Sequence, residues 1–190
     1  MPTSLAIAEE KHALRGRMRQ ALAALPPARR AQEEELVAAA VQATPEWRDA
    51  KVVMAYRAIA TEFSTVGLAN AAWRLGKRVC FPRVTQWGGL DLHEVGGWSD
   101  FVPGATYGIP EPKPDAPSVR ARDVDLGIVP GLAFDAKGGR LGRGGGHFDR
   151  LLPRLDRAWA VAFDCQIVPA VPHEGHDRPV DRVFHAARLA

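Results

Sequence analysis

Residues 140–150 read RLGRGGGHFDR, a run of glycines flanked by arginines and followed by an aspartate. Because glycine has no Cβ, it can adopt positive φ and bring several backbone N–H groups close to one ligand. Arg140 and Arg143 add charged donors whose planar geometry suits phosphate oxygens. The residue types and their spacing therefore predict an anion-binding loop centred on the glycines at 144–146.

Asp149 closes this loop and carries the opposite charge. A carboxylate beside a phosphate is tolerable mainly when a divalent metal lies between them, so the loop favours a nucleotide with magnesium. Asp177 offers a second carboxylate, because magnesium usually takes one or two carboxylates together with phosphate oxygens. On spacing alone, a turn-forming role is the better interpretation of Asp177.

Two better-known nucleotide motifs do not match the loop. The chain contains no Gly-Lys-Ser or Gly-Lys-Thr triplet, which excludes the Walker A pattern. Gly142, Gly144 and Gly146 have the spacing G-x-G-x-G, whereas the dinucleotide fingerprint is G-x-G-x-x-G. Asp164 lies about 20 residues further on, where a dinucleotide site has its acidic residue, so NAD binding remains a weak alternative.

The segments on either side of the loop read as a strand and a helix. Residues 125–135, DLGIVPGLAFD, predict a buried parallel strand that ends at Pro130 and Gly131. Residues 148–155 predict a short amphipathic helix. A strand, a glycine loop and a helix form a recurring phosphate-binding unit, which we favour over the alternative of a mobile surface turn.

A first long helix is predicted over residues 7–25, where apolar residues recur at helical spacing until two prolines stop the segment. Lys11 and Arg15 lie four residues apart and project from one face of this helix, and Arg19 continues the row. The row could clamp a nucleotide that reaches over from the glycine loop. Spacing alone favours the alternative, a solvated charged face.

Strands and helices alternate along the chain, which predicts a mainly parallel sheet covered by helices on both faces. Residues 97–122 are rich in proline and predict an irregular excursion within a single domain spanning residues 1–190. Further helices are predicted from Pro27 to about Thr44 and over 65–75, and further strands over 51–58, 78–84, 88–95, 158–164 and 182–189.

Glu62 follows the first strand and precedes a helix, which places it at the carboxyl edge of the sheet, where open α/β folds bind ligands. An ordinary exposed loop acid is the alternative. Tyr56 stands at the end of the same strand, a position that more often belongs to the core than to a ligand site. Ser64 or Thr65 is predicted to cap the following helix.

The composition limits the classes of partner. Of 190 residues, 46% are hydrophobic, which suffices for one core, and the net charge of +3 suits an anionic small substrate better than nucleic acid. No apolar run is long enough for a membrane span or a signal peptide. The two cysteines lack metal-type spacing, and we expect a reduced, cytoplasmic protein, a monomer rather than an oligomer.

Five segments of the chain, in order, resemble the 5-formyltetrahydrofolate cyclo-ligase family, whose members are also called methenyltetrahydrofolate synthetases. The segment at 129–152 is highly specific, whereas each of the others would be weak alone. The five are KHALR at 11–15, TEFST at 61–65, GIPEP at 108–112, VPGLAFDAKGGRLGRGGGHFDRLL at 129–152 and HDRPVDRV at 176–183.

This resemblance implies a Rossmann-like, three-layer α/β/α sandwich with a mainly parallel central sheet. It also implies ATP-driven, magnesium-requiring closure of 5-formyltetrahydrofolate to 5,10-methenyltetrahydrofolate, through a phosphorylated imidate intermediate and with release of ADP and phosphate. One alternative is a sugar-phosphate isomerase or an acyl-transfer relative of the same architecture, which would not consume ATP. A basic RNA-binding module is the non-enzymatic alternative.

The resemblance also implies roles for individual residues. Tyr56 and Glu62 fall on substrate positions, as do residues 143–147, and Asp149 and Asp177 fall on metal positions. Many family members have two tyrosines where this chain has His147 and Phe148, and a histidine could offer a cation to the transferring phosphate. We expect Arg143 and His147 to be catalytic. The positions implied for ATP are Lys11, Arg15, Arg140, Leu141, Gly142, Arg143, Gly144, Gly145, Gly146, His147 and Phe148.

Overall fold

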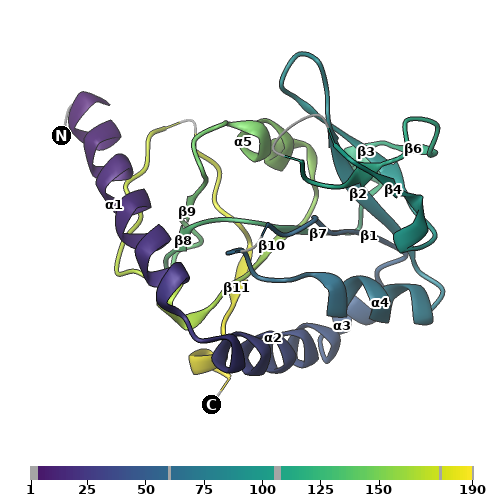
Figure 1. Ribbon diagram of the computed structural model, residues 1–190, viewed down its shortest axis with the longest axis horizontal. Coiled ribbons are helices and arrows are strands. Elements are labelled where there is room, and N and C mark those ends of the chain that lie inside the picture. The colour runs from purple at the N-terminus through teal and green to yellow at the C-terminus, as the bar shows by residue number, and fades with distance from the viewer. Residues whose placement is uncertain (1–3, 60, 105–107, 176, 190) are drawn as a thin grey trace.

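The computed structural model describes residues 4–59, 61–104, 108–175 and 177–189. Its main sheet has seven strands in the order β11-β10-β7-β1-β2-β3-β6 (Figure 1). The first five strands of that order pair in parallel, and β3 and β6 continue the sheet antiparallel. The strands are β1 (Val52–Met54), β2 (Arg78–Val84), β3 (Leu90–Glu94), β6 (Ser118–Val119), β7 (Leu126–Val129), β10 (Ala158–Val161) and β11 (Arg182–Phe184).

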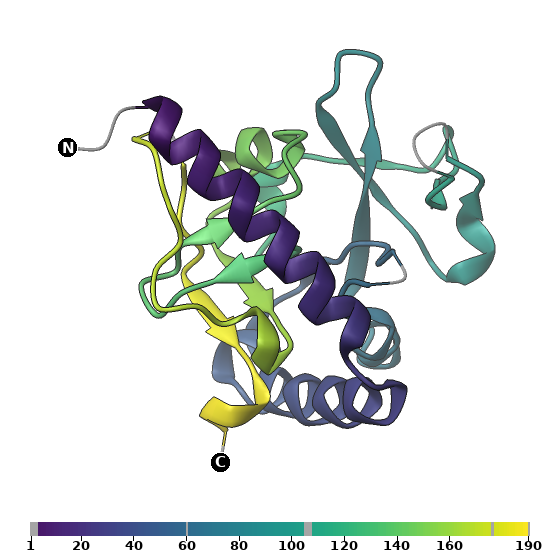
Figure 2. The same cartoon turned by 60° about the vertical axis from the view of Figure 1, so that its left-hand side comes forward.

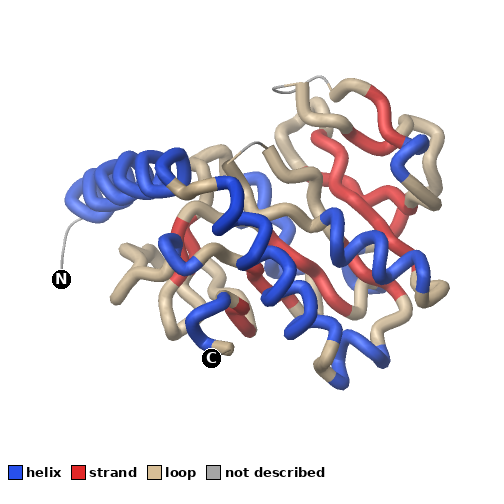
Figure 3. The backbone as a smooth tube through the Cα atoms, turned by 60° about the horizontal axis from the view of Figure 1, so that its bottom comes forward, coloured by secondary structure: helices blue, strands red, loops and turns tan. Residues whose placement is uncertain are grey.

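Helices cover both faces of this sheet, which confirms the three-layer sandwich. Alternate residues of β1 point to opposite faces. Val53 belongs to a core cluster with residues of α1, α2 and α4, whereas Met54 packs in a second cluster with Leu151 of α5. Figure 3 shows helices of the face that carries the first cluster lying over the strands. The α-helices are α1 (Ser4–Ala24), α2 (Pro27–Gln42), α3 (Pro45–Asp49), α4 (Val66–Arg74) and α5 (His147–Leu151).

The sequence pattern located most of these helices and strands, but it missed α3 and some of the shortest strands. The predicted strand at 78–84 matches β2, whereas β1 is shorter than the predicted segment 51–58. Helix α3 is not among the predicted helices, because Thr44 and Pro45 indicate the end of the preceding helix. The same pair also starts a helix: the Thr44 hydroxyl accepts a hydrogen bond from the Trp47 amide, and Pro45 occupies the first turn.

The proline-rich residues 97–122 contain short strands, although residues 105–107 lie outside the described part of the chain. Strand β4 (Phe101–Val102) pairs with β5 (Glu111–Pro112), and β6 joins the edge of the main sheet. Aromatic rings hold the excursion in place: the Trp98 ring lies 4.9 Å from that of Trp73, and Phe101 lies 5.0 Å from Phe81. These contacts join segments distant in sequence, so local patterning does not reveal them.

A short antiparallel pair of strands lies between β7 and the glycine loop along the chain. Strand β8 (Ala133–Phe134) pairs with β9 (Arg140–Leu141), and the loop follows β9 directly. Helix α1 contacts β8 and runs diagonally past this ladder (Figure 2). The short 3-10 helices are η1 (Trp98–Asp100), η2 (Ala121–Asp123), η3 (Leu152–Arg154), η4 (Asp164–Gln166) and η5 (Ala186–Arg188).

Candidate active site

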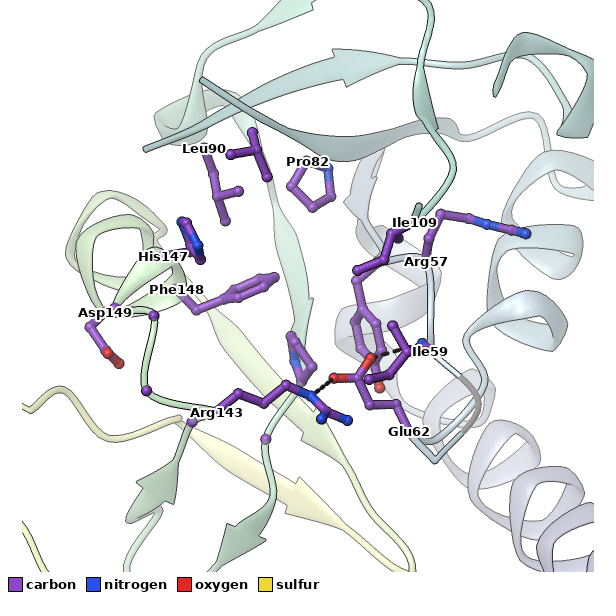
Figure 4. A pocket seen from close by; sticks show the side chains of 18 of the residues that line it. Arg57, Ile59, Glu62, Pro82, Leu90, Ile109, Arg143, His147, Phe148 and Asp149 are labelled. Carbon is purple, nitrogen blue, oxygen red and sulfur yellow. Dashed lines mark hydrogen bonds and ion pairs between the residues drawn. The ribbon is translucent and has the colours of Figure 1, made fainter. Parts of the chain in front are cut away.

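A cavity of about 650 Å³ lies between the glycine loop and the β2–β3 hairpin. Leu90 and Pro82 stand on one side of it, and Glu62 and Arg143 stand on the opposite side (Figure 4). Most of the residues predicted for ligand binding line this cavity: Tyr56, Glu62, Arg140, Gly142 and residues 143–149. Lys11, Arg15, Leu141 and Asp177 do not. Leu141 is buried in the core, and its carbonyl accepts a hydrogen bond from the Leu132 amide.

The glycine loop has the backbone conformation that only glycine adopts readily. Gly144 has a φ of 109°, and Gly146, which immediately precedes α5, has a φ of 67°. Gly145 has no positive φ, but a Cβ there would lie 2.9 Å from Cδ2 of His147. Each of the three glycines is therefore constrained, and the reason for Gly145 is the neighbouring imidazole ring.

Arg140 is the buried cation of the site, with a side chain only 3% exposed. Its guanidinium donates to the Pro130 carbonyl at 3.0 Å and forms an ion pair with Asp149. Burial lowers the pKa of Arg140, and the charges of Asp149 and Asp177 oppose that shift. Because both carboxylates act on the same guanidinium, the fold brings Asp149 and Asp177 to one region, although they are distant in sequence.

Arg143 projects from the loop toward Glu62 across the cavity (Figure 4). Its Nε donates to the Glu62 carboxylate at 2.7 Å, and its Nη2 donates to the Thr61 hydroxyl at 3.2 Å. The second oxygen of Glu62 accepts the Ile59 amide at 3.1 Å. Glu62 is therefore held in a fixed orientation and is not the ordinary exposed loop acid of the alternative interpretation.

Helix α1 supplies two cations beside the loop. Nε of Arg15 donates to the Gly142 carbonyl at 2.9 Å. Lys11 is buried and pairs with Asp177 and with Glu174. Burial lowers the pKa of Lys11, but hydrogen bonds and charge from these two carboxylates outweigh burial, and the net shift is upward. The interpretation of Lys11 as part of a solvated face is therefore wrong.

The two predicted metal ligands suit magnesium in part. The Asp149 side chain is 38% exposed, and within the described residues its Oδ2 makes no hydrogen bond. The structure describes no cluster of three or more potential metal ligands. That is compatible with magnesium, because this ion usually takes one or two carboxylates and completes its shell with phosphate oxygens and water.

His147 is fixed by the β2–β3 hairpin, which sequence reasoning did not connect with the site. The Gly88 carbonyl can only accept, so Nδ1 of His147 carries a proton and donates it at 2.7 Å. Arg150 of α5 donates to the same carbonyl. This arrangement leaves Nε2 of His147 beside Gly145, at the cavity wall.

Tyr56 lines the cavity but is only 3% exposed. Its hydroxyl donates to the Phe63 carbonyl at 2.9 Å, and burial raises the pKa of Tyr56 well above its usual value. Apolar residues to which the sequence analysis gave no role complete the wall. They are Ile59, Pro82, Val84, Leu90, Ile109 and Pro110, from segments that only the folded chain brings together.

Asp164, the acidic residue on which the NAD-binding alternative depends, has a structural role. The Asp164 carboxylate accepts the Ala187 amide at 2.8 Å and pairs with His185 and Arg29. These contacts attach the C-terminal segment to α2.

No helix among the described residues is long and apolar enough to span a membrane.

Known proteins resemble the chain over nearly its whole length. The model of the 5-formyltetrahydrofolate cyclo-ligase family matches residues 7–186. The 5-formyltetrahydrofolate cyclo-ligase of Mus musculus is 29% identical over 92% of this chain and 93% of its own. The Escherichia coli K12 enzyme of the same name is 30% identical over 90% of this chain and 98% of its own.

Solved structures agree with this assignment. The NMR structure of Aquifex aeolicus 5,10-methenyltetrahydrofolate synthetase has a TM-score of 0.80 and 31% identity, covering 92% of this chain and 88% of that chain. A synthetase from Mycoplasma pneumoniae, at 18% identity and a TM-score of 0.75, shares the fold. Sequence, architecture and these relatives agree: the chain is an enzyme that belongs to the 5-formyltetrahydrofolate cyclo-ligase family.

Proposed function

We propose that the protein catalyses the ATP-driven closure of 5-formyltetrahydrofolate to 5,10-methenyltetrahydrofolate, releasing ADP and phosphate. One observation carries the proposal: a single cavity joins a glycine loop with two arginines to an apolar wall. The loop suits a triphosphate, and the wall suits a flat heterocycle. Reacting groups bound at the two ends would meet beside Glu62 and Arg143.

The chemistry explains why phosphate groups are needed. The formyl oxygen is a poor leaving group, so N10 cannot close the ring directly. Transfer of the γ-phosphoryl group to that oxygen releases ADP and gives an imidate phosphate. N10 then attacks the formyl carbon, the C–O bond breaks, phosphate departs, and N10 loses its proton. No protein nucleophile takes part.

Phosphoryl transfer depends mainly on positioning and charge neutralisation, and the residues of the site are suited to both. The amides of the glycine loop, Arg140 and Arg15 would bind the phosphates. Lys11, held beside Asp177, would add charge. Arg143 lies between the loop and Glu62, where the phosphoryl group would pass. His147 would present Nε2 to the same region.

Magnesium fits the proposal as a co-ligand of ATP. Asp149 would hold it through the carboxylate oxygen that makes no hydrogen bond within the described residues, and Asp177 would be the second protein ligand. The ion would neutralise negative charge on the phosphate oxygens.

Pure protein incubated with 5-formyltetrahydrofolate and magnesium-ATP tests the proposal. The expected result is growth of the methenyl absorbance with one ADP formed per product molecule, and none when ATP is omitted. Glu62→Gln should lower turnover, while Glu35→Gln, at an exposed position of α2 outside the cavity, should not. Product formation without ATP would instead favour a relative that does not consume nucleotide.

We further propose that the protein acts in the cytoplasm as a monomer, without a nucleic-acid or membrane partner. The modest net charge of +3 supports the absence of a nucleic-acid partner. Light scattering behind a size-exclusion column would reveal an oligomer.

A further inference from the structure

Four arginines line the cavity, and three of them are already engaged. Arg140 pairs with Asp149, and Arg143 pairs with Glu62. The guanidinium of Arg57 lies over aromatic rings of the excursion, 4.9 Å from the centre of the Trp98 ring. The fourth is Arg19 of α1.

Arg19 is exposed, and within the described residues it makes no hydrogen bond or ion pair. It follows Arg15 by four residues, which displaces it by one helical turn, about 6 Å along α1. Arg15 contacts the glycine loop at Gly142. Arg19 therefore lines the same cavity one turn away from the proposed phosphate-binding loop.

The side chain of Arg30 links the end of α1 to the segment that carries Glu62. Arg30 donates both to the Leu22 carbonyl, at the end of α1, and to the Thr61 carbonyl at 3.4 Å. Thr61 and Glu62 also line the cavity. Arg19 thus stands at the rim where helix α1 approaches the Thr61–Glu62 segment, on the side of the reacting groups.

This placement matters for a folate, an inference that rests on the proposed function. The phosphoryl acceptor is the formyl group on N5, and the nucleophile N10 carries the p-aminobenzoyl-glutamate tail. Both atoms must lie where the two ends of the cavity meet, beside Arg143 and Glu62. The tail therefore starts at the rim near the loop and not at the apolar wall, and it carries carboxylates out of the cavity.

We propose that Arg19 binds a carboxylate of the glutamate tail and so favours substrates that carry this tail over a pteroate that lacks it. A guanidinium suits a carboxylate because its planar donors can bind both oxygens. Arg19 can bind a carboxylate without first breaking an ion pair, whereas Arg140 and Arg143 are already paired with Asp149 and Glu62. An exposed pair of this kind contributes modestly, so the expected change in affinity is about twofold to fivefold.

Steady-state kinetics with three substrates tests this role: 5-formyltetrahydropteroate, which lacks glutamate, 5-formyltetrahydrofolate, and its γ-linked triglutamate. We expect Arg19→Gln to raise KM for the two glutamate-containing substrates by about twofold to fivefold. The KM for the pteroate, the KM for ATP and kcat should not change. Arg19→Lys should restore part of the affinity. Arg17→Gln is the matched control, because Arg17 is exposed on the same helix and does not line the cavity.

The outcomes separate this inference from the proposed function. If the wild type converts the folates but Arg19→Gln affects all three substrates equally, or raises KM for ATP, then Arg19 does not bind the tail. The cyclisation would still stand in that case. If the wild type converts none of the three substrates, the proposed function is wrong, and the role of Arg19 falls with it.

Discussion

Three cations of the candidate site are each held by an acidic side chain. Arg143 pairs with Glu62, Arg140 with Asp149, and Lys11 with Asp177. A phosphate group would enter a region whose positive charges are already oriented, which reduces the cost of ordering them on binding.

Asp149→Asn tests the metal role, because it keeps the shape of the side chain and removes its charge. At limiting magnesium we expect turnover to fall at least about tenfold, or roughly 1.4 kcal/mol of lost transition-state stabilisation. Added magnesium should restore part of the rate. Asp156→Asn, at an exposed position outside the cavity, is the control. Wild-type turnover of Asp149→Asn at limiting magnesium would contradict the metal role.

His147→Tyr tests whether the imidazole contributes positive charge. Tyrosine can donate only a neutral hydrogen bond, whereas an imidazole can also present a cation. If the imidazole stabilises the transferring phosphoryl group with positive charge, His147→Tyr should lower kcat and leave KM for 5-formyltetrahydrofolate unchanged. Unchanged kcat in His147→Tyr would leave His147 with its observed role as the contact between α5 and the Gly88 carbonyl.

At the scale of elements, the short ladder of β8 and β9 leads into the loop, and α1 contacts the loop through the hydrogen bond from Arg15 to the Gly142 carbonyl. Arg15 of α1 approaches Gly144 closely: a Cβ at this glycine would lie 3.7 Å from the Arg15 guanidinium carbon. The loop is therefore shaped both by its own glycines and by an element far away in sequence.

Gly144→Ala and Gly16→Ala form a matched pair on these two elements. At Gly144 the φ of 109° is unfavourable for alanine, so we expect a cost of about 1 kcal/mol or more, seen as weaker ATP binding. A Cβ at Gly16, inside α1, meets nothing within 4 Å. Gly16→Ala should raise the free energy of unfolding by up to about 1 kcal/mol. Calorimetric titration measures the ATP affinity of Gly144→Ala, and an unchanged affinity would contradict the expected cost. Urea unfolding measures the stability of Gly16→Ala.

At the scale of the whole molecule, Asp164 joins the end of β10 to α2 and to the C-terminal segment. Burial raises the pKa of its carboxyl, but the Ala187 amide, His185 and Arg29 outweigh burial, and the net shift is downward. A lowered pKa means that the folded state favours the ionised form. The stabilisation is therefore complete above the unfolded-state pKa and is lost as the pH falls through the folded-state value.

Asp164→Asn should lower the free energy of unfolding at neutral pH by about 1.5 to 3 kcal/mol, the range for hydrogen bonds to a charged group. The difference from wild type should stay constant down to about pH 4, near the ordinary pKa of an aspartate, and should shrink as the pH falls further. Asp115→Asn is the control, because Asp115 is exposed and its side chain makes no hydrogen bond or ion pair within the described residues. A difference that stayed constant on this further acidification would show that the charge of Asp164 does not carry the effect.

The sequence by itself determined the alternation of strands and helices, the position of the glycine loop and the charged row of α1. Each of these follows from a local pattern: the period of the hydrophobic residues, the run of glycines or the four-residue spacing of the cations. It did not determine that Lys11 is buried against Asp177, that Glu62 meets Arg143, or that the Gly88 carbonyl fixes His147. Those pairs join residues between 59 and 166 positions apart, and only the packing of the layers brings them together. Burial also overturned the solvated face that spacing favoured for Lys11, because an ion excluded from water needs a partner whereas an exposed one does not.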